Sequence, residues 1–180
     1  MKTAFTPAIA YQFIKRAKAN FRNNKIVPQE WKNVLDKLEV YVCIAKSLPY
    51  YPECYAMSWM LNDYHGKLYG VDPTQPKIKI GKSKWWLALE FKAEFVCTAD
   101  NTSVFNLVAH ELAHSLDYVL RQKIQVPSES HDNFFRVLEC MMGGLDNYRF
   151  PHRIGLQKRL VKSIDSFGGT SKVASIALSY

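Results

Sequence analysis

The sequence predicts one α+β domain in which amphipathic helices pack against a small antiparallel sheet. Three observations favour this fold class. Apolar residues recur at helical spacing in four segments, one segment alternates apolar with polar residues as a strand does, and 180 residues are enough for one hydrophobic core. No apolar stretch approaches the roughly 20 residues that cross a bilayer, so no membrane span is expected.

Two helices are expected first. Thr6 before Pro7 offers an N-cap followed by a first-turn proline, and apolar residues then keep helical spacing to Asn23. A second, longer helix is predicted between Pro28 and Pro49. The apolar stripe that predicts it consists of Trp31, Val34, Leu35, Leu38, Tyr41, Val42 and Ala45.

The middle of the chain predicts a strand. Residues 50–76 show no clear period, whereas residues 77–96 alternate apolar and polar side chains. An alternation of this length indicates a half-buried antiparallel strand, which ends near Phe95.

Two more helices are predicted after the strand. The first begins at the capping side chains around Asp100 and runs to about Leu120. The second begins near Phe134 and ends at Gly143 and Gly144, because a glycine commonly closes a helix.

These elements organise the chain as a single domain. We expect an N-terminal helical part over residues 1–48, a core over 50–153 and a basic C-terminal extension over 154–180. The four cysteines contain no C-x-x-C pair, which predicts reduced thiols, mostly buried. The N-terminus lacks the pattern of a secretory signal, and we expect a cytoplasmic protein.

Basic residues exceed acidic ones, 24 to 16, which gives a net charge of +8. No acidic residue precedes Glu30, and a second acid-free run covers residues 149–162. The first run contains Lys2, Lys15, Arg16, Lys18, Arg22 and Lys25. Such runs either bind a polyanion such as DNA or form solvated helix faces, and both interpretations stay open.

The strongest chemical signal is His110-Glu111-Leu112-Ala113-His114, inside the predicted third helix. Residues four apart lie about 40° apart around a helix. Both imidazoles can therefore face one ion, and Glu111 can reach a water molecule bound to it. The alternative interpretation is two helical histidines beside a surface carboxylate.

A catalytic zinc site takes three protein ligands, so a third is sought downstream. Asp117 and Leu120 stand where a metzincin continuation needs Gly and His, which excludes that class. Glu139 on the next helix is the candidate for a gluzincin site, and Glu129 is a poorer one. We favour His131, because the apolar spacing of the fourth helix places it on the buried face, at the first turn.

Other polar residues have lesser predicted roles. His65 and His152 lack such a context and are expected at the surface. Asp117 and Asp132 are candidates to accept a hydrogen bond from the imidazole nitrogen that does not bind the metal. Tyr118 is a candidate oxyanion donor or a packing residue.

These motifs resemble the SprT-like zinc metallopeptidase family, of the Spartan type. His110-Glu111-Leu112-Ala113-His114 is similar to its H-E-x-x-H motif, and His131-Asp132-Asn133-Phe134-Phe135 to its third-histidine motif, with Phe135 in the aromatic place. Asp132 stands where the family usually has glycine. The likeness spans roughly residues 50–153.

The resemblance implies a zincin-like minimal metallopeptidase domain and a zinc-dependent endopeptidase, which in some members degrades proteins crosslinked to DNA. His110, His114 and His131 would hold Zn²⁺, and Glu111 would be the general base that takes a proton from bound water. A protein substrate would pair in extended form with the edge of the strand ending near Phe95.

Two other functions stay open on the sequence. In one, the chain is a non-catalytic DNA-binding module. Zinc then has only a structural role, joining the third helix to the fourth, with Cys97 or Cys140 as a fourth ligand. In the other, the chain is an interaction protein that keeps the motif without bound metal.

Overall fold

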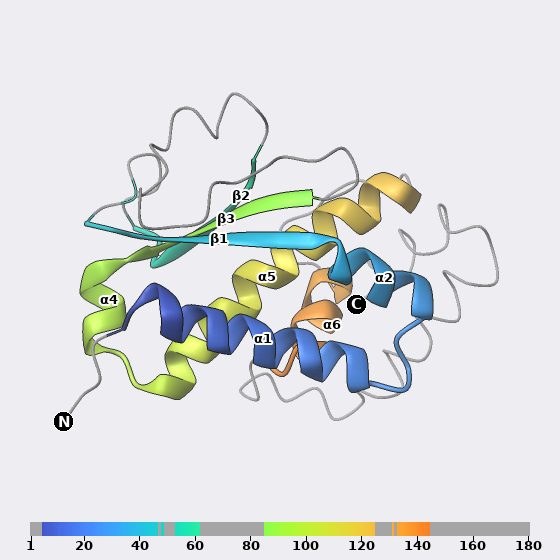
Figure 1. Cartoon of the computed structure of the whole chain (residues 1–180), viewed down its shortest axis with the longest axis horizontal. Coiled ribbons are helices and arrows are strands. Elements are labelled where there is room, and N and C mark those ends of the chain that lie inside the picture. Colours follow the sequence, from blue (N-terminus) through green and yellow to red (C-terminus); the bar gives the residue numbers. More distant parts are fainter. Residues whose placement is uncertain are drawn as a thin grey trace.

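The computed structural model describes residues 5–46, 48, 53–61, 85–124, 131 and 133–144. Figure 1 shows their arrangement as helices packed beneath a small sheet. No helix within these ranges is long and apolar enough to cross a membrane. The elements in chain order are α1 (Pro7–Asn23), α2 (Gln29–Asp36), β1 (Leu38–Ala45), β2 (Ala56–Leu61), β3 (Trp85–Lys92), α4 (Ala93–Thr98), α5 (Asn101–Ile124) and α6 (Asn133–Met141).

The strands form one mixed sheet in the order β1-β3-β2. β3 is parallel to β1 and antiparallel to β2. The predicted α+β class agrees with this arrangement, but the predicted all-antiparallel pairing is wrong because β1 is a parallel neighbour. α1 and α5 lie against one face of the sheet (Figure 1), where Val42, Leu89 and Phe91 join the buried core.

The second predicted helix is correct only in its first half. α2 ends at Asp36, and Leu38–Ala45 forms β1 instead of continuing the helix. The apolar stripe was ambiguous, since Val42 fits both a helical and an alternating period. The β-branched residues Val40, Val42 and Ile44 lose side-chain freedom in a helix and pack well on a sheet, which favours the strand. The N-terminal part is therefore not wholly helical.

The alternating segment 77–96 contains β3, although residues 77–84 lie outside the described ranges. The strand ends at Lys92 and the chain continues directly into α4, so the expected strand end near Phe95 is wrong. β3 also has a neighbour on each side. It therefore offers no free edge to a peptide, and the edge strands of the described sheet are β1 and β2.

α1 covers the outer edge of β1. The ammonium group of Lys18 donates to the carbonyl of Leu38, and Tyr11 is hydrogen-bonded to the backbone of Val42. Leu38 and Val42 are four residues apart, so their backbone groups point to the same side of the strand. That side faces α1.

The predicted helix caps are confirmed at α1 and α5. Thr6 accepts a hydrogen bond from the Ile9 amide at 3.4 Å, with Pro7 in the first turn. Asp100 accepts from the amides of Thr102 and Ser103 at 2.8 and 2.9 Å. Each cap satisfies amides that have no partner inside the helix.

The Asp100 cap makes stability depend on pH. Hydrogen bonds from Ser103, and then from Thr102, lower the pKa of the Asp100 carboxyl below its ordinary value of 3.8. Because the folded-state pKa is depressed, the stabilisation is present above the unfolded-state pKa and is lost as pH falls through the folded value. We expect Asp100→Asn to lower the melting temperature at neutral pH and the difference from wild type to vanish in strong acid. Thermal melts followed by circular dichroism measure both, and a difference that is independent of pH would contradict the prediction.

α6 ends at the glycine pair that the sequence predicts. Gly143 has a φ of 84°, and its amide donates to the Cys140 carbonyl at 3.0 Å. The Gly144 amide donates to the Glu139 carbonyl, also at 3.0 Å. This pattern closes a helix with a left-handed residue. Asn20 of α1 donates to the Met142 carbonyl at 3.0 Å, so α1 also holds this end.

Replacing Gly143 by alanine is expected to reduce the free energy of unfolding by about 2 kcal/mol. About 1 kcal/mol comes from the positive φ. The new Cβ would also clash with Asn20 Nδ2, and displacing that amide costs its bond to Met142, about 1 kcal/mol. Urea titration measures the loss. In an Asn20→Ala background only the first cost should remain, and an equal loss in both backgrounds would rule out the clash.

Candidate metal centre

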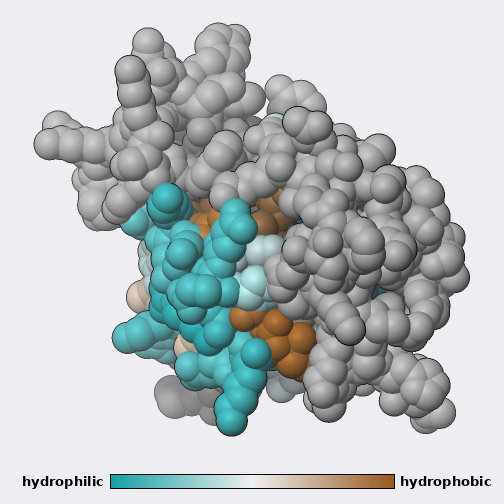
Figure 2. All heavy atoms as spheres, turned by 90° about the vertical axis from the view of Figure 1, so that its right-hand side faces the viewer, coloured by the Kyte–Doolittle hydropathy of each residue, from teal (hydrophilic) through white to brown (hydrophobic). Residues whose placement is uncertain are grey.

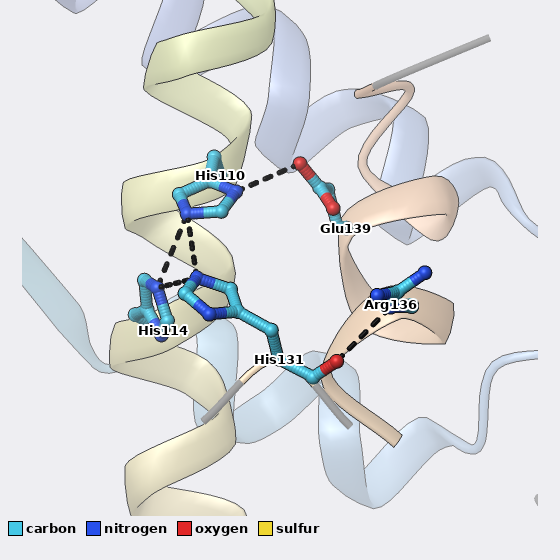
Figure 3. A network of polar contacts seen from close by, with 5 residues as sticks. All are labelled: His110, His114, His131, Arg136 and Glu139. Atoms are coloured by element: carbon cyan, nitrogen blue, oxygen red, sulfur yellow. Dashed lines mark hydrogen bonds and ion pairs between the residues drawn. The ribbon is translucent and has the colours of Figure 1, made fainter. Parts of the chain in front are cut away.

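Three imidazoles converge beside α5 (Figure 3). His110 and His114 come from neighbouring turns of α5, and His131 comes from the turn before α6. The Nε2 atoms of His110 and His114 are 3.2 Å apart, and each is 3.1 Å from the Nε2 of His131. The three residues that the sequence predicts as ligands are therefore close enough to bind one metal ion.

The spacing of these nitrogens fits a small tetrahedral ion. With metal–nitrogen bonds of about 2.0–2.1 Å, tetrahedral coordination sets neighbouring nitrogens roughly 3.3 Å apart. The observed separations are within a few tenths of an ångström of that value. Neutral imidazoles that face one another with lone pairs repel, so the arrangement is favoured when a cation lies among them.

His131 reaches the cluster differently from the prediction. It is not in the first turn of the helix on the buried face; it precedes α6 and is exposed. Its φ is 60°, in the left-handed region, which costs a non-glycine residue about 1–2 kcal/mol. The Nε of Arg136 donates to the His131 carbonyl at 3.0 Å. A side chain one turn into α6 thus holds the backbone of this turn (Figure 3).

Phe135 packs against all three imidazoles. Its ring is stacked on His114 with centroids 4.2 Å apart, and it meets His110 and His131 edge-on, each at 5.0 Å. The side chain is 1% exposed. It therefore limits how far each imidazole can turn away from the common centre.

Glu139 was missed as a contact of the cluster. The sequence suggested it only as a direct ligand of a gluzincin site, and His131 was favoured instead. In the structure it is buried, and its Oε1 is 3.0 Å from Nδ1 of His110. The sequence contains a signal for this position, since Glu139 follows Phe135 by four residues and so lies near it on the helix surface.

Of the other polar residues singled out in the sequence, the structure describes Asp117 and Tyr118. Both carboxylate oxygens of Asp117 accept from Arg121 Nε, at 2.8 and 2.9 Å, in a buried pair. Asp132, His65 and His152 lie outside the described residues. Tyr118 is 45% exposed.

Glu111 is buried beside the cluster, at 5% exposure. Burial raises the pKa of its carboxyl to about 7, against the opposing effects of His110 and of a hydrogen bond from Ser58. Ser58 lies on β2 and was not singled out in the sequence. The hydroxyl connects this carboxylate to the edge strand of the sheet.

The surroundings lower the pKa of two of the three imidazoles. Burial, followed by the charges of His110 and His131, lowers the pKa of His114 to about 3. Burial also lowers the pKa of His131. Burial alone would lower the pKa of His110, but the hydrogen bond that it donates to Glu139 and the charges of both nearby carboxylates raise it above its ordinary value.

No fourth protein ligand joins the three histidines among the residues that the structure describes. Cys140 is outside the group, and the side chain of Cys97 is not described. Among the described residues Cys43, Cys54 and Cys140 form no disulfide, in agreement with the predicted reduced state, but they are half-buried. The described ligand set is therefore three imidazoles.

The chain matches no protein-family model, no curated protein and no solved structure. The resemblance to SprT-like metallopeptidases consequently rests on the two histidine motifs alone.

Proposed function

We propose that this chain is a zinc-dependent endopeptidase of the SprT-like type. His110, His114 and His131 are the proposed ligands, and Glu111 is the proposed general base. The observation that carries the proposal is the convergence of three Nε2 atoms at 3.1–3.2 Å next to a buried glutamate. Three imidazole ligands with an open fourth position are typical of catalytic zinc, whereas a structural site usually closes that position with Cys or His.

The residues supply the parts of a hydrolytic reaction. Bound zinc would lower the pKa of a coordinated water and polarise the carbonyl of the peptide. Glu111 follows the first ligand in α5, and the Ser58 hydroxyl donates to it, so its carboxylate is held beside the cluster. There it would take the proton from the water as the water oxygen bonds to the carbonyl carbon, and would return that proton to the amine as the C–N bond breaks.

The proposed path of the substrate lies along β2. The edge of β1 is covered by α1, and β3 is central. β2 is the other edge of the described sheet, and it carries Ser58, which contacts the proposed base. An extended peptide that added to this edge through main-chain hydrogen bonds would pass the three imidazoles.

DNA is a proposed partner with weaker support. Lys15, Lys18 and Arg22 share one face of α1 by their spacing. However, Lys18 donates to a backbone carbonyl and Arg22 pairs with Asp36 at 2.6 Å. The described surface where α1 ends beside α2 is largely hydrophilic (Figure 2), and the second basic run, 149–162, lies outside the described residues.

The test has two steps. First, elemental analysis of the purified protein measures bound zinc. Second, the protein is incubated with an unfolded basic protein, with and without single-stranded DNA, before and after treatment with a zinc chelator. We expect stoichiometric zinc and cleavage that the chelator abolishes and added zinc restores.

The other outcomes identify the competing functions. Bound zinc without cleavage in any arm, together with DNA affinity that falls steeply with salt, would favour a zinc-fastened DNA-binding module. A folded protein that contains no zinc and takes none up would favour an interaction protein. Either result would overturn the proposed peptidase activity.

A further inference from the structure

The contact between Glu139 and His110 joins two helices at the centre of the site. The two atoms, Oε1 and Nδ1, are 3.0 Å apart, which is a normal hydrogen-bond length. The Glu139 side chain is 5% exposed and that of His110 is 26% exposed. A buried carboxylate without a hydrogen-bond donor is costly, so this contact is expected to persist.

The chemistry of the two groups determines where the imidazole proton lies. A carboxylate only accepts hydrogen bonds, so Nδ1 of His110 is the donor. In a neutral imidazole, the other nitrogen then has no hydrogen and presents a lone pair. That nitrogen, Nε2, is the atom that faces His114 and His131 at 3.2 and 3.1 Å.

Glu139 is not placed to be a metal ligand itself. Its oxygen contacts the nitrogen on the far side of the His110 ring from the cluster (Figure 3). It does not belong to the set of side chains whose ligand atoms converge among the described residues. Any effect of Glu139 on metal binding therefore acts through His110.

We infer that Glu139 is a positioning residue, which holds His110 in the tautomer whose Nε2 is free to bind the ion. The inference rests on the proposed function for the ion, but the tautomer is a property of the metal-free chain as well. In metal sites generally, loss of such an outer partner weakens binding by about 10- to 100-fold.

The decisive variant is Glu139→Met, which keeps an unbranched side chain and removes the acceptor. Nitrogen-15 NMR of the metal-free protein, recorded at alkaline pH where the imidazole is neutral, reports which nitrogen of His110 carries the proton. We expect Nδ1 to carry it in the wild type and the proton to move toward Nε2 in the variant. Zinc affinity, measured by competition with a chromophoric chelator, should fall by about 10- to 100-fold. Glu139→Gln keeps an oxygen at the same place and should retain more of the affinity than Glu139→Met.

A matched control is Glu90→Met. Glu90 is as buried as Glu139, at 4% exposure. It lies on β3 between Leu89 and Phe91, which face the core, so its side chain belongs to the opposite face of the sheet. This variant should leave the His110 tautomer unchanged.

Two results would overturn the inference. One is a Glu139→Met protein in which Nδ1 of His110 still carries the proton, whatever its affinity. The other is equal loss of zinc affinity in Glu139→Met and Glu139→Gln, because that would indicate a general packing role. If neither the wild type nor any variant bound zinc, the proposed function would fail. The NMR result would still show which nitrogen of His110 carries the proton, so it would test the inference separately.

Discussion

Glu111→Gln is expected to retain zinc at the wild-type level and to lower the rate of peptide hydrolysis by about 10²–10⁴-fold or more. Glutamine keeps the size of the side chain but cannot accept a proton from water at neutral pH. Because Glu111 lies outside the three convergent ligands, the metal should be unaffected. Turnover of a fluorogenic peptide and elemental analysis of the same preparation measure the two quantities.

Glu90→Gln is the matched control for this experiment. It neutralises another buried carboxylate, on the sheet, that has no proposed role in the reaction. Its turnover per folded molecule should equal that of the wild type. Wild-type proteolysis by Glu111→Gln would show that the general base is a different residue.

His114→Ala is expected to weaken zinc binding by more than the roughly 100-fold that loss of an outer partner causes, because it removes a direct ligand. His114 is the imidazole that stacks on Phe135 and lies within 3.2 Å of both other nitrogens. The two that remain cannot enclose the ion. Competition with a chelator of known affinity measures the change.

His65→Ala provides the comparison for the ligand variant. It removes a histidine from a segment for which the sequence predicts no metal role, so the affinity should stay at the wild-type value. If His114→Ala bound zinc as tightly as the wild type, the cluster of three would not be the binding site.

The closeness of His110 and His114 was predictable because it follows a short-range rule. Two histidines four residues apart on a helix share a face whatever surrounds them. His131 was chosen for a place on the buried face of the next helix, but it joins the cluster from an exposed turn before α6. Its backbone could not be predicted, since neither the motif nor the apolar spacing sets the φ of 60° at His131, whose carbonyl accepts a hydrogen bond from Arg136.

The fold was less predictable where one pattern fits two periods. Leu38–Ala45 satisfies helical spacing and also alternates, and only pairing with β3, more than forty positions later in the chain, selects the strand. The contact of Glu139 with His110 was missed for a similar reason. A polar side chain off the apolar stripe is normally solvent-exposed, and its burial depends on where α5 lies.

The hydrogen bond from Asn20 to the Met142 carbonyl joins residues 122 positions apart. A ribosome that has released the chain only as far as α5 has produced both motif histidines but neither His131 nor the helix that Asn20 anchors. Such a nascent fragment has two of the three nitrogens and cannot retain an ion tightly. Under the proposed function, loading of an ion, and any activity that depends on it, would therefore wait until synthesis has passed α6.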